Sequence, residues 1–179
     1  MTKFIKRPPE KYENTDNGLT FRPFNNDDSD GLIRLATDPL TTRFVPWAKF
    51  VTDTRSAEYR IAEFNSSYDE ELRVRYAVEK DGKLVGYAGI WPDGKSGYIE
   101  FGFAVLPKQR GKKIGSEILD TVRIIASAEL QATGIVAYVH DGNNASKATV
   151  LRAGFKPSEE FDGEDRRYEL MIMTNETTI

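Results

Sequence analysis

A basic, glycine-containing segment, residues 108–116, is the part of the sequence best suited to bind an anion. It follows a predicted strand and leads into a predicted helix, so that unpaired backbone N–H groups and the positive end of the helix dipole meet at one point. Gly111 and Gly115 let a phosphate approach the backbone closely. Positive charge is added by Lys108, Arg110, Lys112 and Lys113. We predict a phosphate-binding loop, although neither the P-loop nor the Gly-x-Gly-x-x-Gly motif is present; the alternative is a basic helix start without a ligand.

Glu100 lies just upstream, in a predicted strand whose other side chains are apolar or small, residues 97–105. Burial of a carboxylate in a central strand is unfavourable unless the group has a partner or a purpose. We predict that Glu100 is a general base, with Gly102 leaving room for a substrate. The alternative is an ion pair between Glu100 and a neighbouring strand's arginine, Arg73 or Arg75.

Hydrophobic periodicity predicts the elements that position these groups. Predicted strands cover residues 19–24, 73–80, 83–90, 97–105, 135–139, 155–161 and 167–173, and predicted helices cover a turn around Leu32 and residues 54–66, 112–130 and 145–153. The dipeptide Asp81-Gly82 predicts a tight hairpin. Pro39 predicts the end of the first helix, followed by an aromatic loop at residues 44–47.

The composition is that of one ordinary globular domain. The chain has 179 residues, 39% apolar and 30% charged, which predicts a single domain over residues 18–179. Residues 1–17 mix basic and proline residues, so we predict an extended, solvated N-terminal arm.

Charge and residue usage exclude several classes of function. With 25 Lys and Arg against 28 Asp and Glu, the chain lacks the basic field expected of a nucleic-acid-binding protein. No apolar run reaches the roughly 20 residues that span a membrane. The absence of cysteine excludes disulfides and thiolate chemistry and favours the cytoplasm. His140 is the only histidine, so no metal site is expected, and we predict a solvated position for it.

The loop resembles the pyrophosphate loop of the GNAT superfamily of N-acetyltransferases, which reads Gln/Arg-x-x-Gly-x-Gly/Ala after the fourth strand. Aligned on Gly111, Lys108 stands where Gln or Arg is usual and Lys113 where the second Gly or Ala is usual. Residues 143–146 and 154–155 resemble the Asn-x-x-Ser and Gly-Phe pattern of the ribosomal-protein alanine N-acetyltransferase branch. The resemblance extends over residues 19–173.

This resemblance implies a GNAT fold of the α/β (α+β) class. Its twisted, mixed, mostly antiparallel sheet would splay between the fourth and fifth strands and be flanked by about four helices. The pantetheine of acetyl-CoA would pass through the gap, and the pyrophosphate would lie at the loop. The residues implied at acetyl-CoA are Phe103, Ala104, Val105, Lys108, Gln109, Arg110, Gly111, Lys112, Lys113, Ile114, Gly115, Ser116, Asn143 and Ser146.

The resemblance also implies roles in acetyl transfer. Glu100 matches the position of a general base, and the backbone N–H of Val105, freed by a bulge, would bind the oxyanion. Ser146 would hydrogen-bond the departing sulfur, or is only a helix-capping residue. The family's usual acidic tyrosine is replaced by Val150. The groups left for that role are Ser146, Tyr98, Tyr138 or water.

We therefore predict acetyl-CoA-dependent transfer of an acetyl group to a primary amine, without a metal. The acceptor is a protein N-terminus or a small amine such as a polyamine, amino acid or aminoglycoside. The alternatives are a non-catalytic acyl-CoA-binding module and a domain for another phosphate ligand. Phe44 and Trp47 match a substrate-covering loop or pack on the core, and acidic residues 159–165 attract a cationic amine or form a solvated hairpin tip. Relatives often dimerise, so a homodimer is a further expectation.

Overall fold

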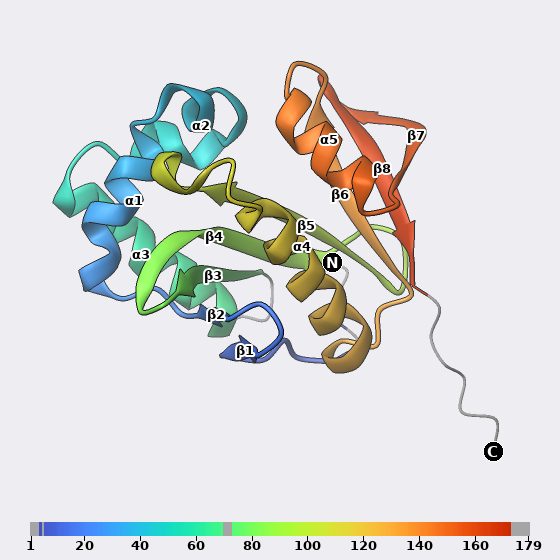
Figure 1. Ribbon diagram of the computed structural model, residues 1–179, viewed down its shortest axis with the longest axis horizontal. Coiled ribbons are helices and arrows are strands. Elements are labelled where there is room, and N and C mark those ends of the chain that lie inside the picture. Colours follow the sequence, from blue (N-terminus) through green and yellow to red (C-terminus); the bar gives the residue numbers. More distant parts are fainter. Residues whose placement is uncertain (1–3, 5, 70–72, 173–179) are drawn as a thin grey trace.

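The computed structural model describes residues 4, 6–69 and 73–172 (Figure 1). They form an eight-stranded sheet of order β1-β2-β3-β4-β5-β6-β8-β7. Only the β5–β6 pair within this sheet is parallel. The strands are β1 (Tyr12–Asn14), β2 (Leu19–Arg22), β3 (Val74–Lys80), β4 (Lys83–Pro92), β5 (Tyr98–Val105), β6 (Gly134–His140), β7 (Lys156–Asp162) and β8 (Asp165–Met171). The mixed, mostly antiparallel sheet expected from the sequence is confirmed. Met173, the end of the last predicted strand, lies outside the described residues.

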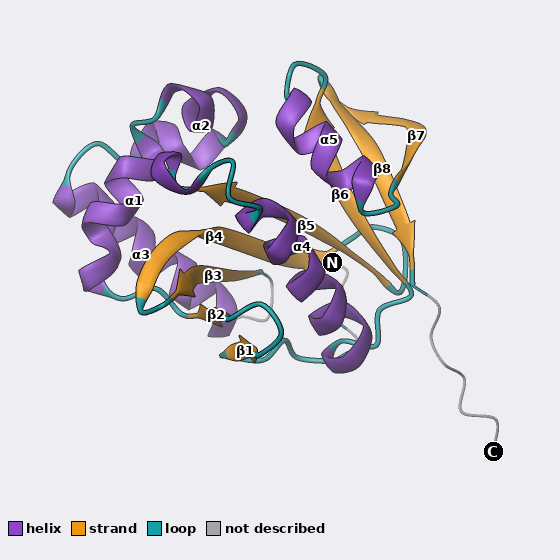
Figure 2. Cartoon of the chain, viewed as in Figure 1, coloured by secondary structure: helices purple, strands orange, loops and turns teal. Residues whose placement is uncertain are grey.

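Helices cover both faces of the sheet (Figure 2). In the described residues they are α1 (Ser29–Ala36), α2 (Pro39–Phe44), α3 (Thr54–Asp69), α4 (Ile114–Ile124) and α5 (Asn144–Arg152). Apolar residues of α1 and α3 pack with Ala77, Tyr87 and Ala104 on one face, and α4 packs on the other. None of the helices in the described part of the chain is both long and apolar enough to cross a membrane.

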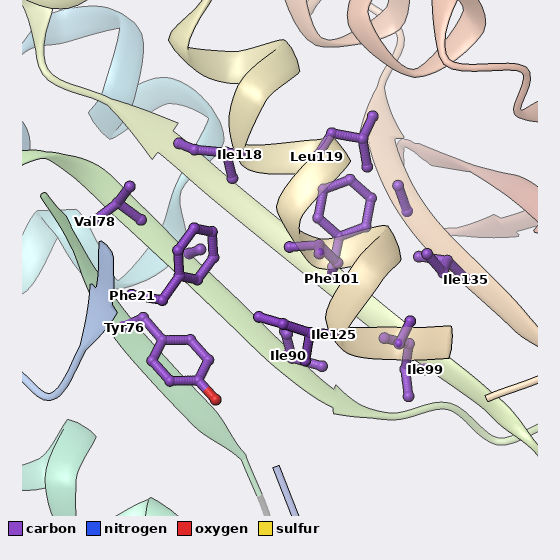
Figure 3. Packing of buried hydrophobic residues seen from close by; sticks show 14 of the residues in the cluster. Phe21, Tyr76, Val78, Ile90, Ile99, Phe101, Ile118, Leu119, Ile125 and Ile135 are labelled. Carbon is purple, nitrogen blue, oxygen red and sulfur yellow. The ribbon is translucent and has the colours of Figure 1, made fainter. Parts of the chain in front are cut away.

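The amphipathic pattern of α4 places one stripe of side chains on the sheet. Ile118, Leu119 and Val122 are fully buried, and Figure 3 shows Ile118 and Leu119 near Phe101 of β5. The apolar stripe continues through Ile125 into a π-helical turn, Ile125–Glu129. The four-, four- and three-residue spacing of this stripe correctly predicted a long amphipathic helix.

The sheet splays between β5 and β6, and we call the line between these two strands the seam. Their parallel register contains three Cα pairs, Tyr98 with Gly134, Ile99 with Ile135 and Glu100 with Val136. Beyond this point β5 runs on to Val105 paired with β4, and β6 runs on to His140 paired with β8. The predicted splay is confirmed, and it leaves a gap that opens from Glu100 toward the end of β5.

One helix was missed because Pro39 was interpreted only as a helix end. Asp38 accepts a hydrogen bond from the Thr41 N–H at 2.9 Å, and Pro39 occupies the first position of α2. Proline suits that position because its missing N–H would be unpaired there in any case. The residues predicted as an aromatic loop are therefore the end of α2 and a short 3-10 helix, Pro46–Phe50.

Part of the predicted N-terminal arm belongs to the sheet. β1 pairs with β2, which adds a strand before the first predicted one. Pro8 is buried, and the hydroxyls of Tyr68 and Tyr76 donate to the carbonyls of Pro8 and Pro9 at 3.2 and 2.5 Å. These hydrogen bonds, made by residues 60 or more positions away, fix a segment whose own sequence resembles a solvated tail.

Candidate active site

Two adjoining cavities lie at the gap between β5 and β6. The first, of about 510 Å³, is enclosed by the end of β5, the loop before α4, and the starts of α4 and α5. Its charged lining residues are Arg110, Lys113 and Arg152, so we call it the basic cavity. The second, of about 290 Å³, lies at Glu100 and is also lined by Asp162 and Asp165, so we call it the acidic cavity. The two cavities share Phe44, Val45, Phe103, Asn143 and Ser146.

Most residues predicted to bind acetyl-CoA line the basic cavity. They are Phe103, Ala104, Val105, Gln109, Arg110, Gly111, Lys113, Ile114, Gly115, Ser116, Asn143 and Ser146. Lys108 and Lys112 do not line it; the Lys112 ammonium instead donates to the Gln109 side chain at 3.2 Å. The predicted loop is therefore brought together in space, with two of its four cations outside the cavity lining.

The loop turns into α4 through two residues with positive φ, Gly111 at 76° and Lys113 at 66°. The N–H groups of Ile114 and Gly115 are then at the first helical positions, which have no partner within a helix. A Cβ on Gly115 would lie 3.0 Å from the Phe103 ring, so glycine allows α4 to begin close against β5. This geometry presents backbone donors to the basic cavity, as expected of an anion site.

The left-handed backbone at Lys113 leads to a prediction about stability. Such a conformation is strained for lysine by about 1 kcal/mol and is relaxed for glycine. Lys113→Gly should therefore have a Tm about 2–4 °C above that of Lys113→Ala, which removes the same charge but keeps the Cβ. Thermal unfolding of the two variants measures the difference. Equal Tm values would show that the residue is not strained.

Arg110 connects the loop to α2. Its guanidinium pairs with the Asp38 carboxylate at 2.6 Å and donates to the Thr41 hydroxyl at 3.0 Å. The Arg110 hydrogen bond is the main reason that the pKa of Asp38 is held below its ordinary value, with the Thr41 N–H contributing. Leu40 and Thr41 of α2 also line the basic cavity. From the sequence, Arg110 was predicted only to add positive charge to the loop. Its hydrogen bonds to Asp38 and Thr41 were not predicted.

Two further residues of the basic cavity were missed by the sequence analysis. Thr149 and Arg152 line it together with Ser146, all three on α5. Their spacing of three places them on the same side of a helix. Had that spacing been applied from Ser146 onward, it would have indicated both residues.

Glu100 faces the acidic cavity without an ionic partner among the described residues. Arg75 donates to the Ser67 hydroxyl at 3.2 Å, and the Arg73 guanidinium lies 5.9 Å from the Trp91 ring. Burial raises the pKa of Glu100, and the Asp93 and Asp162 carboxylates add to this effect, which Trp91 and Arg73 partly oppose. The structure thus gives no support to the ion-pair alternative.

The space above Gly102 is occupied by an aromatic side chain. A Cβ on Gly102 would lie 3.2 Å from the Trp91 ring. The sequence analysis assigned this space to a substrate, but it accommodates Trp91, which itself lines the acidic cavity. The other aromatic residues that line this cavity are Phe44, Trp47, Tyr87, Phe101, Phe103 and Tyr138.

The Val105 N–H points into the gap, although not because of a bulge. The β4–β5 register is continuous, with Gly86 opposite Val105. The next N–H, of Leu106, donates to Val85 on β4 at 2.9 Å. Since successive N–H groups of a strand point to opposite edges, that of Val105 points away from β4, into the gap that the splay opens.

Asn143 and Ser146 both line the two cavities at the start of α5. Asn143 is the N-cap, and its side chain accepts from the Ser146 N–H at 3.2 Å. The capping role thus belongs to Asn143, while Ser146 supplies the capped N–H. Of the tyrosines considered as acids, Tyr138 lines the acidic cavity and Tyr98 lines neither cavity.

His140 is partly exposed, and both of its ring nitrogens have partners. Its Nδ1 accepts from the Gly142 N–H at 2.9 Å, and its Nε2 lies 2.8 Å from a Glu164 carboxylate oxygen. The imidazole is 5.3 Å from the Phe44 ring and lines the acidic cavity. His140 therefore shapes the turn that leads to Asn143.

Solved structures share this fold. A proposed ribosomal-protein-serine acetyltransferase from Vibrio cholerae superposes with a TM-score of 0.76 at 15% identity, covering 92% of this chain and 99% of the other. RimL, a ribosomal L7/L12 alpha-N-protein acetyltransferase in complex with coenzyme A, gives 0.74 at 15% identity, with 87% and 94% covered. A spermidine N-acetyltransferase chimera of Vibrio cholerae SpeG and hSSAT gives 0.68 at 17% identity, with 86% and 95% covered.

Sequence comparison identifies the family. At the identities given above, the structural likeness establishes the fold and leaves the acceptor open. The search of curated proteins gave no significant match. The family model for the acetyltransferase (GNAT) domain matches residues 18–156, more than three quarters of the chain and including the loop, Glu100 and α5. The chain therefore belongs to the GNAT family of N-acetyltransferases.

Proposed function

We propose that the protein transfers the acetyl group of acetyl-CoA to a primary amine that arrives as a cation. The observation that carries this proposal is the division of charge across the gap. The lining of the basic cavity contains Arg110, Lys113 and Arg152 and, among the described residues, no carboxylate. The lining of the acidic cavity contains Glu100, Asp162 and Asp165 and, over the same residues, no lysine or arginine. A polyanionic acetyl donor suits the basic cavity, and a cationic acceptor suits the acidic cavity.

The basic cavity fits the phosphates and pantetheine of acetyl-CoA. The N–H groups at the start of α4, with Arg110 and Lys113, would hold the pyrophosphate. Asn143, at the junction of the cavities, would contact the pantetheine. Acetyl-CoA supplies the acetyl group as an activated thioester.

The junction and the acidic cavity provide the groups that acetyl transfer needs. Glu100 would accept the proton of the attacking amine, directly or through water, and its raised pKa suits a base. The Val105 N–H would donate to the developing oxyanion, because it points into the gap. Ser146 would hydrogen-bond the departing sulfur, since it lines both cavities.

The acceptor that we favour is a protein N-terminal α-amine, because the sequence resembles the ribosomal-protein branch. If the protein acetylates a small amine instead, the alternative acceptors are a polyamine, an amino acid or an aminoglycoside. The alternative to catalysis is a non-catalytic acyl-CoA-binding module. A cytoplasmic location and a homodimer stay predictions.

Thiol release tests the function. With acetyl-CoA and a panel of peptide N-termini, polyamines, amino acids and aminoglycosides, CoA should appear only when an acceptor is present. Acetyl-CoA should also raise the Tm, whereas ATP and NAD should not. Tight acetyl-CoA binding with no turnover on any amine would instead support a binding module.

A further inference from the structure

Arg167 of β8 lies at the centre of a buried hydrogen-bond network beside the acidic cavity. Its two terminal nitrogens donate to the Asp93 carboxylate oxygens at 3.1 and 2.8 Å, and its Nε donates to Glu169 at 2.6 Å. Arg167 and Asp93 are each only 5% exposed. One terminal nitrogen also donates to the Tyr138 hydroxyl at 3.0 Å. The guanidinium is thus fixed on three sides.

The network joins the two halves of the splayed sheet. Asp93 follows β4, and its N–H donates to the Tyr98 carbonyl at the start of β5. Arg167 is on β8, on the other side of the seam. Because few residues pair directly across the seam, this ion pair fixes how β6 and its side chains sit relative to Glu100. The position of Tyr138 is therefore set from both halves.

The Tyr138 hydroxyl has its proton available for the acidic cavity. An arginine only donates, so the Tyr138 oxygen must accept from Arg167, and the phenolic O–H is free to donate elsewhere. Val136 is the Cα partner of Glu100, and Tyr138 is two residues further along β6. Alternate residues share a face of a strand, so Tyr138 and Glu100 face the same side across the seam. Both line the acidic cavity.

The acidic cavity brings together the hydroxyl groups that could protonate a leaving group. Val150 lines it, and so do Ser146 and Tyr138. An aliphatic hydroxyl is a far weaker acid than a phenol, so Ser146 can hydrogen-bond a sulfur atom but gives up its proton poorly. Of the two hydroxyl-bearing side chains, Tyr138 carries the phenol, and Arg167 fixes its oxygen while leaving its O–H free to donate.

Resting on the function proposed above, we propose that Tyr138 donates the proton to the departing sulfur and that Arg167 is the residue that positions it. The cationic amine first loses one proton to water and becomes the neutral nucleophile. Glu100 then takes a second proton from the nitrogen as this nitrogen forms a bond to the acetyl carbon. The bond from that carbon to sulfur breaks, its electron pair moves to sulfur, and Tyr138 protonates the sulfur. The proton on Glu100 returns to the phenolate through water. The products are the N-acetylated amine, the free thiol and the one proton that the ammonium gave to water, and both side chains regain their starting states.

Tyr138→Phe tests the proton donor, with Tyr98→Phe as the matched control. The first substitution removes only a hydroxyl and keeps the ring. We expect kcat to fall about 100-fold, with the Kd of acetyl-CoA and the KM of the acceptor within twofold. Tyr98 is buried on β5 and lines neither cavity, so Tyr98→Phe should keep kcat within twofold. Ser146→Ala should lower kcat less than Tyr138→Phe does.

Arg167→Lys tests the positioning role, with Arg166→Lys as its control on the same strand. Lysine keeps the charge but cannot reach Asp93 and Tyr138 together as a forked guanidinium does. We expect a roughly tenfold fall in kcat without a matching rise in KM, and no such fall for Arg166→Lys. In a double-mutant cycle, Arg167→Lys should have no further effect on kcat once Tyr138 is phenylalanine. A purely structural role would lower kcat equally in both backgrounds.

Two results would overturn the proposal while the function stands. One is wild-type turnover on an amine with kcat unchanged in Tyr138→Phe. The other is a Ser146→Ala loss larger than that of Tyr138→Phe. A wild-type protein that acetylates no amine would instead contradict the proposed function itself. Circular dichroism and acetyl-CoA binding, measured on each variant, separate lost chemistry from lost folding.

Discussion

Glu100→Gln should lower kcat about 1000-fold while acetyl-CoA binds with unchanged affinity. A positioned general base typically contributes 10²- to 10⁴-fold, and the amide keeps the size of the side chain but cannot take a proton. Glu100 lines the acidic cavity and not the basic one, so the donor site should be unaffected. Steady-state kinetics on an accepted amine and calorimetry with acetyl-CoA measure the two quantities.

The raised pKa of Glu100 gives this prediction a pH dependence. The base acts when deprotonated, so kcat of the wild-type protein should fall with decreasing pH, beginning at a higher pH than an ordinary carboxyl group would give. Because the folded-state pKa is raised, ionised Glu100 opposes folding as the pH rises through that pKa. Glu100→Gln should therefore be at least as stable as the wild type at neutral pH, despite its loss of activity.

Glu129→Gln is the control for this experiment. Glu129 is exposed on the π-helical turn and lines neither cavity. Its substitution should leave kcat and the pH profile unchanged. An unchanged kcat in Glu100→Gln would remove Glu100 from the role of base and leave water as the proton acceptor.

Arg167→Met should destabilise the fold by about 3–5 kcal/mol, since breaking a buried ion pair leaves one charge buried without a partner. For a protein of this size the Tm should fall by roughly 6–20 °C. The double variant Asp93→Leu with Arg167→Met removes both charges and should recover most of this loss. Urea unfolding of the two variants gives the comparison. A single-variant loss below about 1 kcal/mol would contradict the buried pair.

The ion pair between Asp93 and Arg167 also predicts how the stability of the fold depends on pH. Burial alone would raise the pKa of Asp93, but the Arg167 guanidinium and the N–H groups of Lys95 and Gly94 hold it below its ordinary value. The stability that this carboxylate contributes is therefore present above its unfolded-state pKa and is lost as the pH falls through the lower folded-state pKa. The charge-free double variant should lose less stability over that acid range than the wild type.

Local signals in the sequence were sufficient for much of the fold. The hairpin at Asp81 and Gly82 is confirmed, and both residues have the positive φ that such a turn requires. The apolar stripe of α4 and the order of the strands after it are also confirmed. The order of the N-terminal segment could not be predicted this way, because Pro8 and Pro9 are held by tyrosines 60 or more residues away and Asn14 of β1 donates to the Thr121 hydroxyl. α2 was missed because the same Asp-Pro dipeptide ends one helix and starts the next.

The two cavities differ in how far the sequence could predict them. The loop of the basic cavity is contiguous, so its glycines and cations indicated a site directly. The acidic cavity combines residues from β4, β5, β6 and the last hairpin. Glu100 was singled out by its own strand, whereas Asp162 and Asp165 were noted only as part of an acidic run with no predicted position beside Glu100. Arg167 and Asp93 are 74 residues apart, and nothing in either local sequence indicates the other.

The division of charge between the cavities also bears on how the products leave. Acetylation turns a cationic ammonium into a neutral amide, which Glu100, Asp162 and Asp165 no longer attract. The other product, CoA, keeps every phosphate of the donor and stays attracted by Arg110, Lys113 and Arg152. Product inhibition should therefore come from CoA and hardly from the acetylated amine, and the amide should depart first.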